Sequence, residues 1–250
     1  MKQRLGCVSY INSLPYSIPL SLNKQIAITY DVPTKLFSLF LQKKLDIVIT
    51  SSSHSFLSGQ KNFISSLGIG ANNSILSVNL YTSYNLFQNK NPIIKVTNES
   101  SSSVLLLKIL CKFYWNLTPT FIVSNSDIKT ISKNCDGFLL IGNQALFYPK
   151  LKNFYTFDLA KEWFNFSKLP FVFALCYMQK ESDYANNIEE LFKQSLIWSD
   201  NHKDFIIDTA HKLSALKKTI LQKYFQLCIY RLSSKHLEGL NKFQYLYEKL

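Results

Sequence analysis

Short apolar runs alternate with polar segments along the first third of the chain. Residues 34–41 carry Leu36, Leu39 and Phe40 at the spacing of one buried helical face. Residues 46–50 are almost continuously apolar, which is typical of a parallel strand covered on both faces. Further apolar runs predict strands at residues 5–8, 26–30, 64–69 and 74–82. The chain is therefore predicted to begin as an α/β unit.

A second α/β pattern follows a polar, turn-rich stretch of the chain. It predicts helices at residues 104–115 and 126–132, and strands at residues 93–96, 119–123, 138–141, 154–157 and 171–178. Apolar stripes in the remaining chain predict helices at residues 185–199, 204–213, 215–230 and 234–248. The fold class is therefore predicted to be α/β with a helical C-terminal part.

These patterns predict two lobes, with the chain crossing between them at residues 83–92 and again near residues 173–179. The N-terminal lobe would then be discontinuous, comprising residues 1–84 plus 179–250, with the C-terminal helices packed on it. Residues 85–178 would form the second α/β lobe. Two α/β lobes with two crossings and a cleft between them are the geometry of hinge-closing binding proteins.

Four loops rich in Ser, Asn or Gly follow predicted strands and precede predicted helices. They are residues 9–13, 51–54, 97–103 and 142–144. Ligands of open α/β sheets bind at the carboxyl ends of strands, and helix N-termini favour anions. Hydroxyl, amide and backbone N–H groups that converge there suit carboxylates. Helix capping alone would also explain single loops, although only one serine of the run 100–103 can be the cap.

The first of these loops is the most informative. Asn12 and Ser13 are residue types that begin helices, and Pro15 suits a first helical turn. Tyr10 and Asn12 are thus expected above a helix N-terminus, unless the loop is a capped turn without a ligand. In the second loop, His54 has the chemistry of a general base, but an exposed histidine at a helix start is the simpler interpretation.

Composition narrows the class of protein. The chain of 250 residues is 47% hydrophobic and 18% charged, which is a globular balance. Its net charge is +12, but Arg4 and Arg231 are the only arginines, and the lysines are scattered. Because arginine is the usual residue for bidentate reading of bases, we expect a solvated surface and no nucleic-acid partner. The positive charge also suits a small anionic substrate.

The cysteines and the apolar runs indicate the compartment. Five cysteines, an odd number without a CxxC pair, include Cys7, Cys111 and Cys176 inside apolar runs, where buried thiols are expected. Residues 169–178 form the longest apolar run, which is too short to span a bilayer. No apolar segment follows the basic residues of the first positions, so no secretory signal is expected. We therefore expect a cytoplasmic protein without a membrane partner.

Two classes of site are disfavoured by the sequence. The chain has seven glycines and lacks a glycine-rich phosphate fingerprint, which argues against dinucleotide and nucleotide loops. The histidines at positions 54, 202, 211 and 236 are dispersed, with no metal-binding spacing between them or with cysteines. We therefore expect neither a metal nor an organic cofactor.

Several motifs fall in the order seen in one enzyme family. They are Ser-Tyr-Ile-Asn-Ser-Leu-Pro at residues 9–15, Asp-Val-Pro-Thr at 31–34, Leu-Asp-Ile-Val at 45–48, Ser-Ser at 51–52, Ser-Ser-Ser-Ser-Val at 100–104, Leu-Ile-Gly-Asn at 140–143 and Leu-Pro-Phe-Val-Phe-Ala at 169–174. From about Arg4 to Leu246 the chain resembles the chorismate dehydratases of the futalosine route to menaquinone. The resemblance implies a two-lobed fold similar to type II periplasmic binding proteins, with a central cleft.

The resemblance also implies a reaction and its residues. Chorismate would lose water to give 3-[(1-carboxyvinyl)oxy]benzoate without a cofactor, with Asn12 as the catalytic residue. The family's serine/threonine loop falls on Ser100, Ser102 and Ser103. The expected substrate-binding residues also include Tyr10, Ser51, Ser52, Gly142 and Asn143. The chain departs from the family at three positions, with Asn143 for aspartate, Ser102 for threonine and Lys168 for glycine.

The chemistry of the loops is compatible with this reaction. Glu99 is the only carboxylate within the four loops. The hypothesis is therefore that the enolpyruvyl carboxylate of the substrate accepts the proton, with Asn12 orienting it. Two alternatives remain open: a solute-binding protein of the same fold, which the lack of a signal sequence disfavours, and the related 1,4-dihydroxy-6-naphthoate synthase, whose N-terminal motif differs from Tyr10-Ile11-Asn12.

Overall fold

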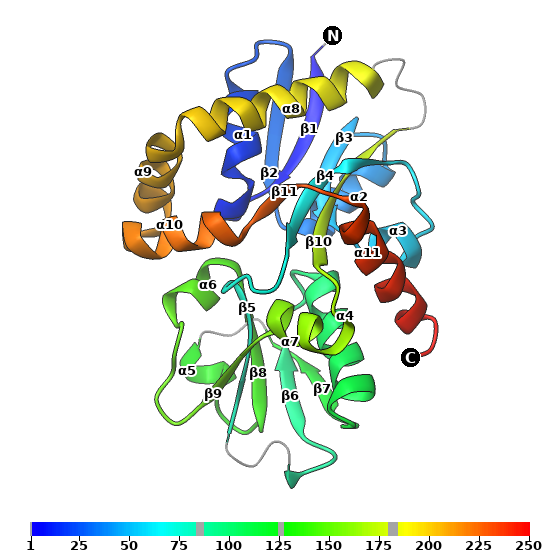
Figure 1. The fold of residues 1–250 in the computed structure, drawn as a ribbon, viewed down its shortest axis with the longest axis vertical. Coiled ribbons are helices and arrows are strands. Elements are labelled where there is room, and N and C mark those ends of the chain that lie inside the picture. Colours follow the sequence, from blue (N-terminus) through cyan, green and yellow to red (C-terminus); the bar gives the residue numbers. More distant parts are fainter. Residues whose placement is uncertain (1, 84–87, 125–127, 180–184) are drawn as a thin grey trace.

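The computed structural model describes residues 2–83, 88–124, 128–179 and 185–250, which form two α/β lobes stacked end to end (Figure 1). One lobe contains a six-stranded sheet and both ends of the described chain. The other lobe contains a five-stranded sheet. The two sheets come from alternating parts of the chain, because the chain leaves the first lobe after its fourth strand and returns later.

The sheet of the first lobe has the strand order β11-β4-β10-β3-β1-β2. Its strands are β1 (Gln3–Val8), β2 (Ile26–Asp31), β3 (Ile47–Ser51), β4 (Phe63–Ala71), β10 (Phe171–Met178) and β11 (Ile229–Arg231). β1 pairs in parallel with β2 and β3, whereas β10 runs antiparallel between β3 and β4. Leu5 and Cys7 of β1 pack in one buried cluster and Val8 packs in another, so both faces of the sheet are covered.

Helices cover both faces of this sheet. They are α1 (Leu14–Ser21), α2 (Pro33–Leu41), α3 (His54–Leu57), α8 (Ala185–Asn201), α9 (Lys203–Ser214), α10 (Lys218–Leu227) and α11 (Ser234–Tyr247). α8 packs on α1, where the rings of Tyr16 and Phe192 lie 5.4 Å apart between centroids. β11 pairs with β4. The C-terminal segment is therefore part of the first lobe and not a third body.

The sheet of the second lobe has the strand order β7-β6-β8-β5-β9. Its strands are β5 (Val78–Thr82), β6 (Ile93–Val96), β7 (Thr120–Val123), β8 (Gly137–Ile141) and β9 (Tyr155–Asp158). Its helices are α4 (Ser101–Ile109), which continues into a π-helical turn at Leu110–Tyr114, α5 (Ile128–Ile131), α6 (Gly142–Phe147) and α7 (Leu159–Ser167). The predicted helix at residues 126–132 falls partly on residues outside those described.

The first crossing lies at residues 72–77, because β5 pairs with β8 and β9 of the second sheet. The prediction that placed it at residues 83–92 is wrong, and part of that stretch, residues 84–87, lies outside the described residues. The carboxylate of Asp158 explains the change of direction. It accepts hydrogen bonds from Ser74 Oγ and from the backbone N–H groups of Ile75 and Leu76, at 2.6–2.8 Å. The predicted strand at residues 74–82 is therefore a turn held by Asp158, followed by a shorter strand that begins at Val78.

The return crossing lies at residues 168–170, because β10 belongs to the first sheet from Phe171 onward. The prediction near residues 173–179 is therefore displaced as well. Lys168 ends α7 in a left-handed conformation with φ of 60°. Glycine adopts this conformation at the least cost, so Lys168 stands at a position that favours glycine.

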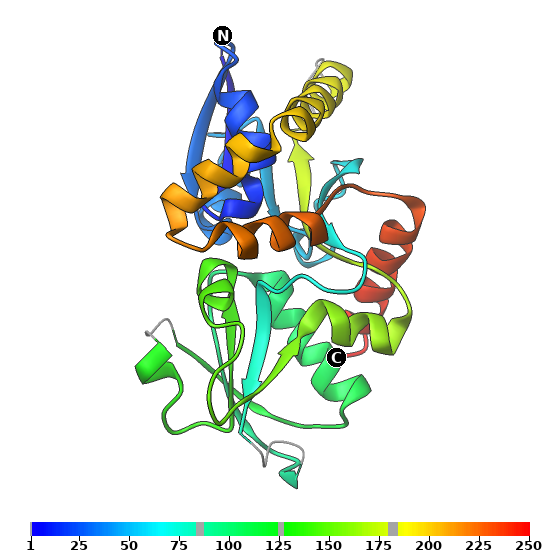
Figure 2. The same ribbon diagram turned by 60° about the vertical axis from the view of Figure 1, so that its left-hand side comes forward.

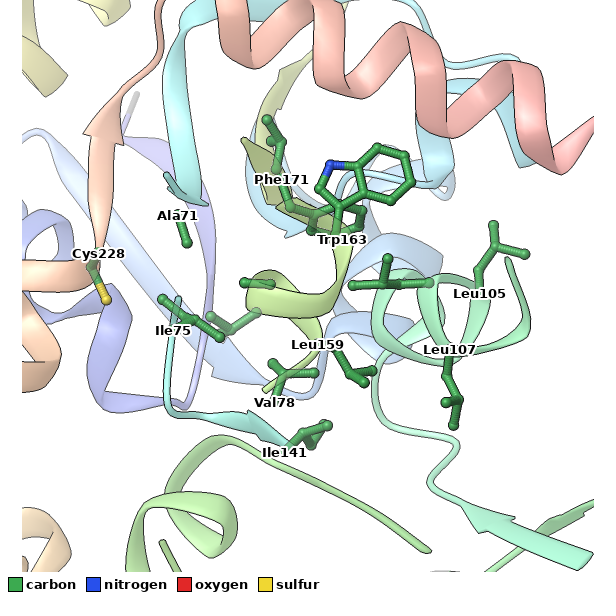
Figure 3. Close-up of a cluster of buried hydrophobic side chains, with 14 of the residues drawn as sticks. Ala71, Ile75, Val78, Leu105, Leu107, Ile141, Leu159, Trp163, Phe171 and Cys228 are labelled. Carbon is green, nitrogen blue, oxygen red and sulfur yellow. The ribbon is translucent and has the colours of Figure 1, made fainter. Parts of the chain in front are cut away.

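A buried apolar cluster joins the lobes beside the return crossing (Figure 3). Trp163 of α7 lies at its centre, with its ring 5.5 Å from that of Phe171, and its indole N–H donates to the carbonyl of Pro170 at 3.2 Å. α11 contacts both β10 of the first lobe and α4 of the second. Figure 2 shows α10 (orange) on another side of the junction, above α6. The junction is therefore packed on more than one side.

Candidate functional site

A cavity of about 60 Å³ lies between the lobes at the carboxyl ends of β1, β3 and β8. Its lining from the first lobe is Val8, Tyr10, Asn12, Pro33, Thr50, Ser51, Ile69, Phe173 and Ala174. The crossing and the second lobe contribute Ile75, Ser77, Val78, Ser100, Ser103, Ile141 and Gly142. The structure thus brings together residues from all four loops that the sequence singled out.

The loop after β1 is held by hydrogen bonds from the hydroxyl of Ser13 to backbone carbonyl groups. No side chain among the described residues caps the helix that follows. The hydroxyl of Ser13 donates to the carbonyl groups of Val8 and Tyr10, both at 2.8 Å. These bonds stabilise the 3₁₀ turn Ile11–Ser13, and Pro15 follows in the first turn of α1. The predicted role of Pro15 is therefore confirmed, whereas Ser13 makes no side-chain cap. Asn12, in the middle of this turn, lines the cavity.

Asn12 presents an unused acceptor at this site. Its Oδ1 is buried and has no hydrogen-bond partner among the described residues. Buried polar atoms are rarely left in this state, which points to a ligand or a water as the partner. The hydroxyl of Tyr224, from α10, contacts the side chains of Asn12 and Ser77. Burial raises the pKa of Tyr224 well above its usual value, so its hydroxyl stays protonated.

The serine run at the start of α4 divides its hydroxyl groups between three tasks. Ser100 is the N-cap, because its Oγ accepts from the N–H of Ser103 at 3.4 Å and donates to the Oγ of Ser103 at 3.0 Å. Ser101 accepts from Ser53 of the first lobe at 3.0 Å. Ser102 donates to the carbonyl of Phe173 at 2.8 Å. Ser100 and Ser103 line the cavity at the N-terminus of a helix, where anions are favoured.

Three of the expected substrate-binding residues lie outside the lining of the cavity. The hydroxyl of Ser52 donates to the carbonyl of Val172 at 2.6 Å, so Ser52 and Ser102 both bind the start of β10. Asn143 is the second residue of α6, and its Oδ1 is buried without a partner in the described structure. Ser52 and Ser102 therefore position Val172 and Phe173 of β10, and Asn143 follows the lining residue Gly142 without itself lining the cavity.

Tyr10, which lines the cavity, makes two contacts with the second lobe. The hydroxyl of Tyr10 donates to Glu99 Oε2 at 2.9 Å. The ring of Tyr10 also packs on Gly142, where a Cβ would come within 2.8 Å of it. Gly142 has φ of 56°, so glycine serves both the left-handed backbone and the close approach. Burial, and then the carboxylate of Glu99, raise the pKa of Tyr10.

The expectation that His54 is exposed is wrong. Its ring stacks on that of Phe37 with centroids 3.7 Å apart and planes 3° apart, and it is 8% exposed. Burial lowers the pKa of His54 to about 4, so the ring is neutral near pH 7. His54 does not belong to the lining of the cavity. The lining contains no carboxylate, histidine, lysine or arginine among the described residues, and Tyr10 is its only titratable side chain.

Two further findings concern the whole described chain. Cys7, Cys111 and Cys176 are buried, as their apolar surroundings in the sequence predicted. No cluster of His, Cys, Asp or Glu in residues 2–83, 88–124, 128–179 and 185–250 has the geometry to hold a metal ion. Over these same ranges, every helix is too short or too polar to cross a membrane.

The fold and the interlobe cavity define a class of protein with the periplasmic-binding-protein-like fold, as the sequence predicted. Protein AF1704 of Archaeoglobus fulgidus superposes with a TM-score of 0.81, at 16% identity, over 99% of this chain and 97% of that chain. The periplasmic aliphatic sulphonate binding protein SsuA of Escherichia coli gives a TM-score of 0.68, at 11% identity, over 99% of this chain and 87% of that chain.

The family follows from the sequence comparison. The model of the family described as "Menaquinone biosynthesis" matches residues 3–249, and the chain belongs to this family. Chorismate dehydratase of Campylobacter jejuni is 27% identical to this chain, over 89% of this chain and 96% of that protein. The resemblance drawn from the seven motifs is therefore confirmed, and a role for the protein in menaquinone biosynthesis is supported.

Proposed function

We propose that this protein is a chorismate dehydratase, a carbon–oxygen lyase that converts chorismate to 3-[(1-carboxyvinyl)oxy]benzoate and water. The observation that carries the proposal is the lining of the interlobe cavity. It offers hydroxyl, amide and backbone N–H donors but no acidic or basic side chain among the described residues. Such a site suits a dicarboxylate that brings its own charge and its own base.

The bonds that change set the demands on the site. The hydrogen on the ether-bearing ring carbon is conjugated through a ring double bond to the ring carboxylate. Its removal places negative charge on that carboxylate. The neighbouring hydroxyl then takes up the abstracted proton and leaves as water, which completes an aromatic ring. Ser100, Ser103 and the first N–H groups of α4 are suited to stabilise this charge, because donors aimed at a developing anion lower the barrier.

The substrate's enolpyruvyl carboxylate is our proposed proton acceptor. It lies beside the hydrogen that is lost, and the lining of the cavity supplies no carboxylate or histidine to compete for the task among the described residues. Asn12 would orient this carboxylate through its Nδ2–H groups, or would accept a hydrogen bond from the departing hydroxyl at Oδ1, which has no partner among the described residues. In this mechanism the reaction needs no metal, since the proton acceptor and the electron sink both belong to the substrate.

The volume of the cavity implies that the lobes separate to admit the substrate. A cavity of about 60 Å³ is far below the roughly 300–1,000 Å³ of ordinary ligand pockets. The hydrogen bonds Tyr10–Glu99, Ser53–Ser101 and Ser102–Phe173 between the lobes are all donated by side-chain hydroxyl groups, so they can break without unfolding either lobe. The described state is then a closed one, and binding of chorismate would select a more open state.

Incubation of the pure protein with chorismate tests the proposal, with the products separated by chromatography and identified by proton NMR. We expect an aromatic dicarboxylate that retains the enolpyruvyl group, formed at the same rate before and after treatment with a chelator. Binding of chorismate without turnover would instead identify an anion-binding protein of the same fold. A different aromatic product would identify another lyase.

A further inference from the structure

A second, larger cavity lies within the first lobe, between α1 and the C-terminal helices. Its volume is about 440 Å³, which falls in the range of ordinary small-molecule pockets. Residues of α8, α9, α10 and β11 line it, together with Pro15 of α1. It shares no lining residue with the interlobe cavity. The proposed reaction therefore leaves this cavity without a role.

The inner wall of the second cavity is apolar and partly aromatic. Ile206 and Ile207 of α9 are buried there, and the rings of Phe225 and Tyr230 add aromatic surface. The hydroxyl of Tyr230 is buried and lacks a hydrogen-bond partner among the described residues. A wall of this kind accommodates a flat ring system, because aromatic pairs gain energy beyond the area they bury.

The rim of the cavity is positively charged. Arg231 is paired with Asp200 at 2.9 Å, whereas no carboxylate of the described residues forms an ion pair with Lys203. Lys203 is also the first residue of α9, and His202, the N-cap of this helix, makes no side-chain cap. The first turn of α9 also carries Asp204, which lies outside the lining, so at the lining itself the N–H groups of this turn and the ammonium group of Lys203 favour an anion.

We propose that this cavity is a binding site for an aromatic monocarboxylate, with the ring against Phe225 and Tyr230 and the carboxylate at Lys203 and the start of α9. The apolar wall, the volume and the ammonium group of Lys203, which has no ion-pair partner among the described residues, all favour an aromatic ligand with one carboxylate. A phosphorylated ligand fits less well, because one lysine without an unpaired arginine gives too little charge. The site is separate from chorismate turnover, so this proposal does not rest on the proposed function.

Calorimetric titration with 2-naphthoate tests the site, because this probe carries one carboxylate on a flat ring system. We expect saturable binding at one site, and binding at least tenfold weaker for the neutral analogue 2-naphthalenemethanol. Lys203→Gln should weaken the binding of 2-naphthoate about tenfold. Gln226→Trp, at an exposed position of the lining, should abolish binding by filling the cavity. Lys212→Gln on the same helix, outside the lining, is the matched control and should bind as the parent does.

The outcomes separate this site from the interlobe cavity. The proposal is overturned if the parent shows no saturable binding, or if Lys203→Gln and Gln226→Trp bind 2-naphthoate as tightly as Lys212→Gln. Competition by chorismate together with unaffected variants would place the probe in the interlobe cavity and would also overturn it. Circular dichroism melting of each variant checks folding. A failure of chorismate turnover in the parent would leave the binding result intact.

Discussion

Ser103 is the residue on which the proposed binding of a substrate carboxylate most depends. Its hydroxyl lines the cavity beside the N-cap Ser100, at the start of α4. A charge-assisted hydrogen bond contributes about 1.5–3 kcal/mol, so Ser103→Ala should raise the dissociation constant of chorismate by about one to two decades. Ser101→Ala removes a hydroxyl of the same turn that bonds Ser53 instead, and it should weaken binding by less than about fivefold. Equal affinities of the two variants in calorimetry would refute the assignment.

Tyr224 is predicted to be a positioning residue that acts through Asn12. Its buried hydroxyl contacts the side chains of Asn12 and Ser77 but does not line the cavity. Tyr224→Phe should therefore lower kcat about tenfold or more and leave KM nearly unchanged. The double variant Asn12→Ala/Tyr224→Phe should be no slower than Asn12→Ala, because residues that act together are not additive. Additive losses in a steady-state assay would show that Tyr224 is only part of the core.

At the scale of elements, the point where β8 ends and α6 begins controls how closely the lobes approach. Gly142 and Gly59 both have positive φ, of 56° and 63°. A Cβ at Gly142 would come within 2.8 Å of the ring of Tyr10, whereas a Cβ at Gly59 meets nothing within 4 Å. Both alanine substitutions should cost about 1–2 kcal/mol of stability through the backbone. Only Gly142→Ala should also oppose closure and weaken chorismate binding at least tenfold, and equal affinities would contradict this.

Most elements could be predicted from the sequence, because their apolar spacing is local. The strands at residues 93–96 and 171–178 match the structure at both ends. The failures arise from contacts distant in sequence. The carboxylate of Asp158 turns the chain at residues 74–76 and shortens the predicted strand, and β11 forms at the end of a predicted helix because β4 offers it an edge. Neither partner can be identified from a local pattern.

The sequence allowed us to predict which loops form the site, but not which of their side chains face the cavity. The four loops converge as expected, because each follows a strand and precedes a helix. Whether a serine faces the cavity or a neighbouring carbonyl depends on β10, which lies about 70 residues from Ser102 and 120 from Ser52. Tyr224 comes from an amphipathic helix whose stripe predicts only core packing, so no sequence pattern distinguishes it.

At the scale of the whole molecule, His54 should make stability depend on pH. Burial lowers its pKa from 6.5 to about 4. Between these values the unfolded chain binds a proton and the folded chain does not, so stability is fully present above pH 6.5 and is lost as the pH falls toward 4. The loss attributable to this group reaches about 3 kcal/mol. His54→Phe keeps a ring against Phe37 without the titration. Its urea-unfolding free energy should fall less than that of the parent between pH 7 and 4.5, and parallel curves would contradict the assignment.

The two-lobed arrangement places at the lobe junction a cavity whose described lining has no acidic or basic side chain, and the account depends on what that site does with chorismate. The measurement that tests it most directly is the rate of aromatic product formation by the parent and by Asn12→Ala, with chorismate affinity measured on the same samples. We predict turnover by the parent, and for Asn12→Ala a loss of about a hundredfold to a thousandfold in rate with affinity within a few-fold of the parent. A parent that binds chorismate without forming product, or an Asn12→Ala variant that turns over normally, would contradict the account.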